Sequence, residues 1–258
     1  MEECQMEISV KRDGLTLRGT LERPEGIEKC PITIIFHGLM SNRGVGKNGM
    51  HDILTEKLLK RGIAVVRFDF NGHGESDGEF ENMTVYGEIL DAMVIMEYVK
   101  KLDFVTDIYI AGHSQGALVG GMMAGYYREL VSKLVLMAPA ATIPDDAQRG
   151  SCFGKMYDVY NPPEHIDMRD TEQNEYKLGQ KYMRSARTLP VYETTSMFLG
   201  KTLILHGTKD EAVGIIGSLR YKQCMDNVTL HLIEDETHGL DTISLENVLE
   251  EAAEFLKN

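Results

Sequence analysis

The chain has 258 residues and a formal net charge of −13, with 43% hydrophobic and 26% charged residues. This length fits one large α/β domain with a substantial core, and the composition argues against wholesale disorder. The acidic balance also argues against a protein that tracks nucleic-acid phosphates or docks on anionic membranes.

The N-terminal stretch MEECQMEISVKRDG lacks the basic start and the apolar stretch of a signal peptide, and no run of about 18 apolar residues follows. The four cysteines are scattered and form no C-x-x-C pair, whereas disulfide frameworks are typical of much shorter secreted chains. We therefore expect a cytoplasmic protein with four reduced thiols, at Cys4, Cys30, Cys152 and Cys224.

The first 22 residues alternate with a period of two around a DG turn, which predicts an antiparallel hairpin. Further apolar runs of strand length follow in chain order, PITIIF, GIAVVRF, DIYIA, KLVLM, KTLIL and the weaker NVTLHLI. Segments with helical spacing separate most of them, MHDILTEKLLK, MTVYGEILDAMVIMEYVKKL and SQGALVGGMMAGYY among them. This alternation predicts an α/β fold, a mostly parallel eight-stranded sheet with helices on both faces. Ligands of such a sheet bind at the carboxyl ends of its strands.

Residues 140–189 break the rhythm, because they are polar and contain no clear buried strand. A structureless loop of some 50 residues inside a compact domain is improbable. We predict a single domain over residues 1–258, with 140–189 as an inserted lid or cap that has short helices or a small hairpin. A disordered excursion is the alternative, but four tyrosines favour order, Tyr157, Tyr160, Tyr176 and Tyr182.

The sharpest motif is Gly112-His113-Ser114-Gln115-Gly116, a G-x-S-x-G between the run DIYIA and the helical ALVGGMMAGYY. This context is the one that a nucleophile elbow requires. Ser114 would stand above the sheet at a helix N-terminus, where the helix dipole favours developing negative charge. The alternative is a serine that caps an ordinary strand-to-helix loop.

A serine hydroxyl needs a base, and the base needs a group that fixes its tautomer. In this architecture the order along the chain is serine, acid, histidine. Asp210 follows the run KTLILHG, and His238 follows NVTLHLI, so both lie at predicted strand ends. Asp235 competes with Asp210, but it is only three residues from His238 and cannot easily reach the far ring nitrogen.

A serine that attacks an acyl group also needs two donors for the oxyanion that forms. The backbone N–H of Gln115, which follows the nucleophile, is one candidate. The second is the backbone N–H of Leu39, in the loop after PITIIF. The alternative role for Leu39 is a hydrophobic pocket wall.

Together these motifs resemble the α/β-hydrolase superfamily of serine hydrolases, over nearly the whole chain. The stretch DFNGHGES at 69–76 is similar to the D-x-R-G-H-G-x-S block of monoacylglycerol-lipase-like members, with Asn71 in place of the arginine. Within the superfamily the chain resembles bacterial cinnamoyl (feruloyl) esterases, through IIFHG, VVRFDFNGHGESDG, IYIAGHSQGALVG, LVLMAPAAT, LPVYE and LILHGTKD. The resemblance implies a small lid over the acyl pocket, in which Asp146 and Tyr182 contact the hydroxyls of a phenolic ring.

The expected activity is hydrolysis of a hydroxycinnamate ester through Ser114, His238 and Asp210. The expected partner is a small-molecule ester, with no nucleic acid, membrane, metal or cofactor, and the sequence leaves a homodimer open. The alternatives are a monoacylglycerol lipase or short-chain acyl esterase and, from another class, a non-catalytic binding protein with a hydrolase fold. A lipase lid should present a continuous apolar face, whereas residues 145–189 are mostly polar.

Overall fold

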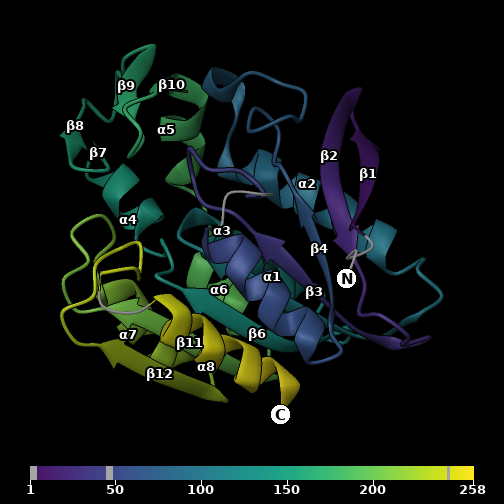
Figure 1. Ribbon diagram of the computed structural model, residues 1–258. Coiled ribbons are helices and arrows are strands. Elements are labelled where there is room, and N and C mark those ends of the chain that lie inside the picture. The colour runs from purple at the N-terminus through teal and green to yellow at the C-terminus, as the bar shows by residue number, and fades with distance from the viewer. Residues whose placement is uncertain (1–4, 45–48, 243–244) are drawn as a thin grey trace.

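The computed structural model describes residues 5–44, 49–242 and 245–258. Its main sheet has eight strands in the order β1-β2-β4-β3-β5-β6-β11-β12 (Figure 1). Strand β2 pairs antiparallel with both β1 and β4, and all other neighbouring strands of the sheet are parallel. The predicted mostly parallel sheet is thereby confirmed. Its strands are β1 (Gln5–Arg12), β2 (Leu15–Glu22), β3 (Cys30–Phe36), β4 (Ala64–Phe68), β5 (Val105–His113), β6 (Val131–Met137), β11 (Lys201–Gly207) and β12 (Val228–Ile233).

Helices cover both faces of the sheet, which explains why the central strands are apolar throughout. Helices α1 (Met50–Lys60) and α8 (Leu245–Lys257) pack against one face, where alternate strand residues such as Ile35 and Val65 point. Helices α2 (Val85–Val99) and α3 (Gln115–Tyr126) cover the other face over the intervening strand residues. No described helix is long and apolar enough to cross a membrane.

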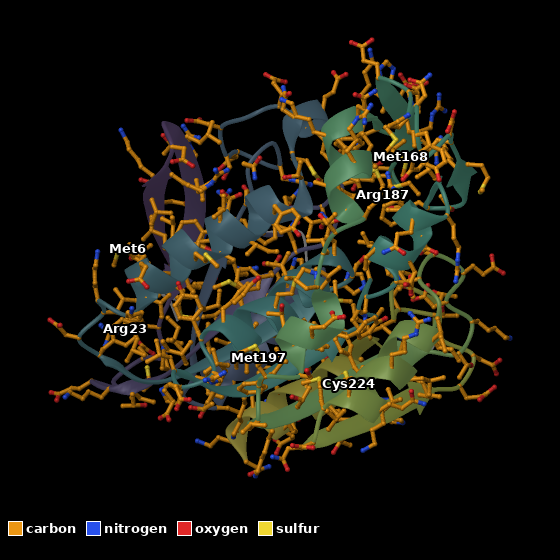
Figure 2. The ribbon with its side chains drawn as sticks, turned by 180° about the vertical axis from the view of Figure 1, so that it is seen from behind. Met6, Arg23, Met168, Arg187, Met197 and Cys224 are labelled. Carbon is orange, nitrogen blue, oxygen red and sulfur yellow. The ribbon has the colours of Figure 1, made fainter. Side chains whose placement is uncertain are left out.

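The segment 140–189 contains regular structure above the main sheet (Figure 1). It has two short hairpins where we expected at most one, β7–β8 and β9–β10, between two short helices. In the rear view of Figure 2, the labelled residues Met168 and Arg187 belong to this segment, at the opposite end of the molecule from Met197 and Cys224. Its elements are α4 (Ile143–Gln148), β7 (Ser151–Cys152), β8 (Lys155–Met156), β9 (His165–Arg169), β10 (Glu175–Gly179) and α5 (Gln180–Ala186).

This segment, hereafter the insert, is seated on a short helical turn, η1 (Phe80–Asn82). The ring of Tyr176 lies 4.8 Å from that of Phe80. A Cβ at Gly179 would fall only 2.0 Å from the carbonyl oxygen of Glu81, so only glycine permits this approach. The insert is therefore packed against the body of the protein at its second hairpin.

Two further helices lie between the insert and the last strand, α6 (Val191–Thr195) and α7 (Ile216–Cys224). The hydrophobic pattern did not predict α7, because its buried positions are Gly217, Ser218 and Tyr221 instead of an aliphatic stripe. Of the cysteines, Cys30, Cys152 and Cys224 are free thiols, and Cys4 lies outside the described residues.

Candidate active site

The turn between β5 and α3 holds Ser114 in a strained backbone conformation, with φ +56° and ψ −123°. A residue with a side chain rarely adopts such a positive φ, so the surrounding structure must impose it. The backbone does so through two hydrogen bonds, from Ser114 N–H to the Met137 carbonyl (2.9 Å) and from Ala140 N–H to the Ser114 carbonyl (3.0 Å). A Cβ at Gly112 would lie 2.4 Å from the Gly116 carbonyl oxygen, which explains the small flanking residues.

The structure brings Ser114, His238 and Asp210 into one hydrogen-bonded line. His238 Nε2 lies 2.9 Å from Ser114 Oγ, and His238 Nδ1 lies 2.8 Å from Asp210 Oδ2. Three loops at the carboxyl ends of β5, β11 and β12 supply these side chains. The residues that the sequence singled out are thus within hydrogen-bond reach of each other, in the order that proton transfer requires.

The carboxylate of Asp210 is fully buried and surrounded by donors. Its Oδ1 accepts hydrogen bonds from the backbone N–H groups of Ala212 (2.9 Å) and Val213 (2.8 Å). Burial alone would raise the pKa of Asp210, but His206, His238 and the Val213 N–H together hold it below its ordinary value. The carboxylate is therefore ionised and can only accept hydrogen bonds, which places a proton on His238 Nδ1 and leaves Nε2 free to accept one.

Three other acidic or histidine side chains near the site make different contacts. Asp235 pairs with Lys209 at 2.6 Å on the surface and makes no hydrogen bond to His238 within the described residues. The buried ring of His206 lies with Nε2 3.1 Å from Asp210 Oδ2 and with Nδ1 2.7 Å from the Ser218 hydroxyl. His113 uses its Nε2 to donate to the His238 carbonyl at 2.8 Å, so it supports the histidine backbone and does not reach Ser114.

The loop that carries Leu39 passes directly beside the serine, because a Cβ at Gly38 would lie 3.0 Å from Ser114 Cβ. Buried His37 fixes the orientation of this loop. Its Nε2 accepts from the Phe70 N–H (3.0 Å), so its Nδ1 carries the proton and donates to the Gly38 carbonyl (2.8 Å). The Gly38 carbonyl and the Leu39 N–H belong to one trans peptide plane and point in opposite directions. His37 therefore also fixes the direction of the Leu39 N–H.

Neither of the two predicted oxyanion donors is engaged by an acceptor in the described part of the chain. The Gln115 N–H stands at the first turn of α3, where helix N–H groups have no intrahelical partner. Two backbone donors, at Leu39 and Gln115, thus flank Ser114 with their hydrogen-bonding capacity unused, as an anionic ligand requires.

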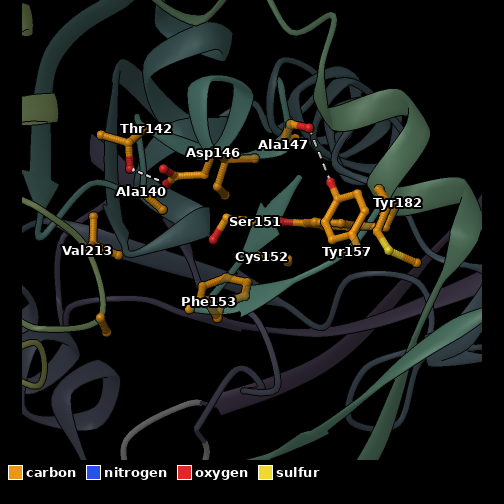
Figure 3. A pocket seen from close by; sticks show the side chains of 14 residues that line it. Ala140, Thr142, Asp146, Ala147, Ser151, Cys152, Phe153, Tyr157, Tyr182 and Val213 are labelled. Carbon is orange, nitrogen blue, oxygen red and sulfur yellow. Dashed lines mark hydrogen bonds between the residues drawn. The ribbon is translucent and has the colours of Figure 1, made fainter. Parts of the chain in front are cut away.

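A pocket that encloses about 580 Å³ of empty space, part of it open to solvent, lies between the insert and Ala212 and Val213 of the loop that carries Asp210. In Figure 3, Asp146 with its partner Thr142 lies on one side of this pocket, and Tyr157 and Tyr182 lie on the other. The wall between them is formed by Ala140, Ile143, Ala147, Ser151, Cys152, Phe153, Gly154, Met183, Ala212 and Val213.

Asp146 and Tyr182 both line the pocket, but their polar atoms are used differently. Asp146 Oδ2 accepts from the Thr142 hydroxyl (2.9 Å), and its other oxygen has no partner within the described residues. The hydroxyl of Tyr182 is buried and donates to Gln115 Oε1 (2.7 Å). The side-chain amide of Gln115 in turn donates to Glu88 Oε2 (2.8 Å).

Sequence reasoning did not find Glu88, which is fully buried within α2. Burial raises its pKa well above the ordinary value, outweighing the hydrogen bond from Gln115. The sequence alone could have indicated that Glu88 is buried, because it lies three residues after Val85 and four before Ala92, on the apolar face of α2. A carboxyl on such a face requires a buried partner.

A mostly parallel sheet with a strained serine between a strand and a helix defines the α/β-hydrolase class. Residues 28–160 match the sequence profile of the family described as serine aminopeptidase, S33. The chain belongs to this family, within the α/β-hydrolase superfamily, and it is a serine esterase that hydrolyses carboxylic esters.

Three relatives show the range of the likeness. Est1E from Butyrivibrio proteoclasticus, solved with ferulic acid bound, is 36% identical, with a TM-score of 0.90 over 96% of this chain and 97% of that one. A monoglyceride lipase homolog of monkeypox virus is 24% identical over 81% of this chain and 84% of its own length. Esterase EstD of Thermotoga maritima is 23% identical over 76% of this chain and half of its own.

Proposed function

We propose that the protein releases hydroxycinnamic acids of the ferulate type from their esters, with Ser114, His238 and Asp210 as the catalytic triad. In this proposal residues 1–258 form one domain and residues 140–189 form a lid over the acyl pocket. The hydrogen-bonded line from Ser114 to Asp210 beside a pocket under the insert is the observation that carries it.

The reaction has two acyl-transfer steps. His238 Nε2 accepts the proton of Ser114 as Oγ attacks the ester carbonyl, and the N–H groups of Leu39 and Gln115 stabilise the oxyanion. Collapse of this intermediate releases the alcohol, which takes its proton from His238, and leaves an acyl-serine ester. Water, deprotonated by His238, then attacks the acyl-enzyme, so that the carboxylic acid leaves and Ser114 regains its proton. Asp210 stays ionised and holds the imidazole in position.

The acyl preference is proposed from the chemistry of the pocket. Asp146 presents a carboxylate oxygen that a phenolic hydroxyl can donate to, and a hydrogen bond to a charged acceptor is stronger than a neutral one. Phe153 and Met183 supply apolar surface for an aromatic ring. The bound ferulic acid of Est1E, the relative described above, supports the same substrate class.

The monoglyceride lipase homolog favours a second function, hydrolysis of a monoacylglycerol. A long acyl chain gains nothing from a carboxylate in the pocket, because burial of a charge against hydrocarbon is unfavourable. We therefore expect the phenolic ester to be the better substrate.

The test compares kcat/KM for methyl ferulate, methyl cinnamate and a monoacylglycerol. We expect methyl ferulate to be preferred, and the variant Asp146→Ala to lose about tenfold or more on it, as for one hydrogen bond to a charged group, with little loss on methyl cinnamate. Asp145→Ala is the matched control, because Asp145 pairs with Arg220 outside the pocket. Preference for the monoacylglycerol, or equal losses on both methyl esters, would contradict the ferulate proposal.

A further inference from the structure

The insert is joined to the body of the protein by a chain of three buried polar side chains. Tyr182 on α5, Gln115 on α3 and Glu88 on α2 are 1%, 0% and 1% exposed. Their hydrogen bonds run from the Tyr182 hydroxyl to Gln115 Oε1 at 2.7 Å, and from Gln115 Nε2 to Glu88 Oε2 at 2.8 Å. Both ends of the Gln115 amide are therefore fixed, one by the insert and the other by the core.

Gln115 is also the residue whose backbone N–H serves the oxyanion in the proposed function, on which this inference rests. Side chain and backbone of one residue share a Cα, so a clamp on the amide restricts the first turn of α3. An oxyanion donor is effective only when it is held in place before the charge develops. The Tyr182 hydroxyl thus acts on the donor without touching the reacting atoms.

The second donor is connected to the insert along a different path. Tyr176 of β10 packs on Phe80 with ring centroids 4.8 Å apart, and Phe80 packs on His73 at 5.1 Å. His73 lies 5.1 Å from His37, whose Nδ1–H holds the Gly38 carbonyl and so the Leu39 peptide plane. The insert is therefore linked to both donors, to Gln115 through Tyr182 and to the Leu39 peptide through the ring contacts that start at Tyr176.

We propose that Tyr182 is a positioning residue that couples packing of the insert to the oxyanion hole. The Gln115 N–H is held in its active position only while the Tyr182 hydroxyl of α5 bonds the Gln115 amide. This role differs from the direct contact with a phenolic substrate hydroxyl that the family resemblance implies. The two roles predict different substrate dependence. Positioning affects every ester, whereas substrate contact affects only esters that carry the hydroxyl.

The experiment measures kcat and KM of Tyr182→Phe on p-nitrophenyl acetate, methyl cinnamate and methyl ferulate. We expect kcat to fall about tenfold on all three with KM changed less than about twofold, a smaller loss than removal of a whole oxyanion donor. Tyr86→Phe is the matched control, because the Tyr86 hydroxyl also joins α2 to the insert, at the Thr188 carbonyl (2.8 Å), while no hydrogen bond among the described residues links it to either donor. It should leave kcat unchanged, and it should lower thermal stability less than Tyr182→Phe does, because the Tyr86 hydrogen bond is exposed and that of Tyr182 is buried.

A double-mutant cycle tests the route through Gln115. Gln115→Ala keeps the backbone N–H but removes the amide, so Tyr182→Phe should cause little further loss in that background. Additive losses, a loss confined to methyl ferulate, or unchanged kcat in Tyr182→Phe would overturn the inference. The proposed function fails on a separate result, retained hydrolysis by Ser114→Ala, and the acetate ester makes the test independent of any preference for ferulate.

Discussion

At the residue scale, the site depends on whether the carboxylate of Asp210 or that of Asp235 faces the His238 imidazole. Asp210 and Asp235 lie at neighbouring strand ends, and only Asp210 is buried against the imidazole, with Oδ2 2.8 Å from Nδ1. Asp235 is half exposed and pairs with Lys209. The Ser114, His238 and Asp210 positions were predictable, because strand ends and chain order restrict the choice to few residues.

A matched pair of amides tests this assignment. Asp210→Asn should lower kcat on the order of 10⁴-fold, because an amide no longer fixes the correct tautomer of His238. Asp235→Asn should stay within about twofold of the unaltered protein, since it changes only a surface pair. Comparable losses in the two variants, measured with p-nitrophenyl acetate, would refute the assignment of Asp210.

Other residues at the site were not predictable in the same way. Glu88 pairs with a group 27 residues away along the chain, and His37 with one 33 residues away, so only the packed fold brings these partners together. His206 lies four residues from Asp210, but its contact with that carboxylate also depends on how the loop after β11 folds. The sequence identifies them as polar residues in apolar surroundings, but not their partners. Tyr182 was expected to contact substrate through its hydroxyl, and the structure places that hydroxyl on Gln115.

At the scale of elements, the turn between β5 and α3 depends on close backbone approach. A Cβ at Gly116 would lie 2.3 Å from the His37 carbonyl oxygen and 2.4 Å from that of Phe36. These are backbone atoms at the end of β3, next to the loop with Leu39. Helix α3 can therefore begin beside β3 only with glycine at this position.

Gly116→Ala should lower the free energy of unfolding by about 2 kcal/mol or more through overpacking, and it should also reduce kcat by moving the two oxyanion donors apart. Gly214→Ala is the matched control, because its Cβ would meet only Ile216 Cγ2, at an ordinary 3.7 Å. Urea unfolding and turnover of p-nitrophenyl acetate measure both effects. If Gly116→Ala behaved like Gly214→Ala, the close contact would have no role.

The insert shows the limit of sequence reasoning at this scale. Residues 140–189 interrupt the alternation of strand and helix, and the prediction of an insert there rests on that interruption. Short helices or a small hairpin were expected in it, but the number and bounds of these elements were not predictable, because strands of two residues such as β7 and β8 contain no periodicity to recognise. In the main sheet the central strands are apolar runs and the N-terminal hairpin alternates with a period of two, and for these strands the prediction was correct.

At the scale of the whole molecule, several buried histidines share one electrostatic behaviour. Burial lowers the pKa of His51 and His73 to about 3 and that of His113 to about 4, and it also lowers the pKa of His37. Their folded pKa values lie below the unfolded value of 6.5. The stability that they contribute is therefore present above pH 6.5 and is lost as the pH falls below it.

The free energy of unfolding should accordingly decrease between pH 7.0 and 5.5, by on the order of 1 kcal/mol for each of His51, His73 and His113. Glu88 acts in the opposite direction, because its raised pKa makes the folded state less stable as the pH rises above 4.5. The decrease should therefore be larger in Glu88→Gln than in the exposed control Glu79→Gln. Urea unfolding in about 0.15 M salt, which screens the net charge, provides the measurement. A urea midpoint of Glu88→Gln that is the same at pH 7.0 and pH 5.5 would disprove the account of the buried histidines.

The central claim is that Ser114 forms the acyl-enzyme, and covalent labelling with a fluorophosphonate tests it most directly. Mass spectrometry should find one adduct per chain, on the peptide that contains Ser114. Labelling and ester hydrolysis should both be lost in Ser114→Ala, hydrolysis by on the order of 10⁴-fold or more, and both should persist in the surface control Ser132→Ala. An adduct on another residue, or hydrolysis retained by Ser114→Ala, would contradict the account.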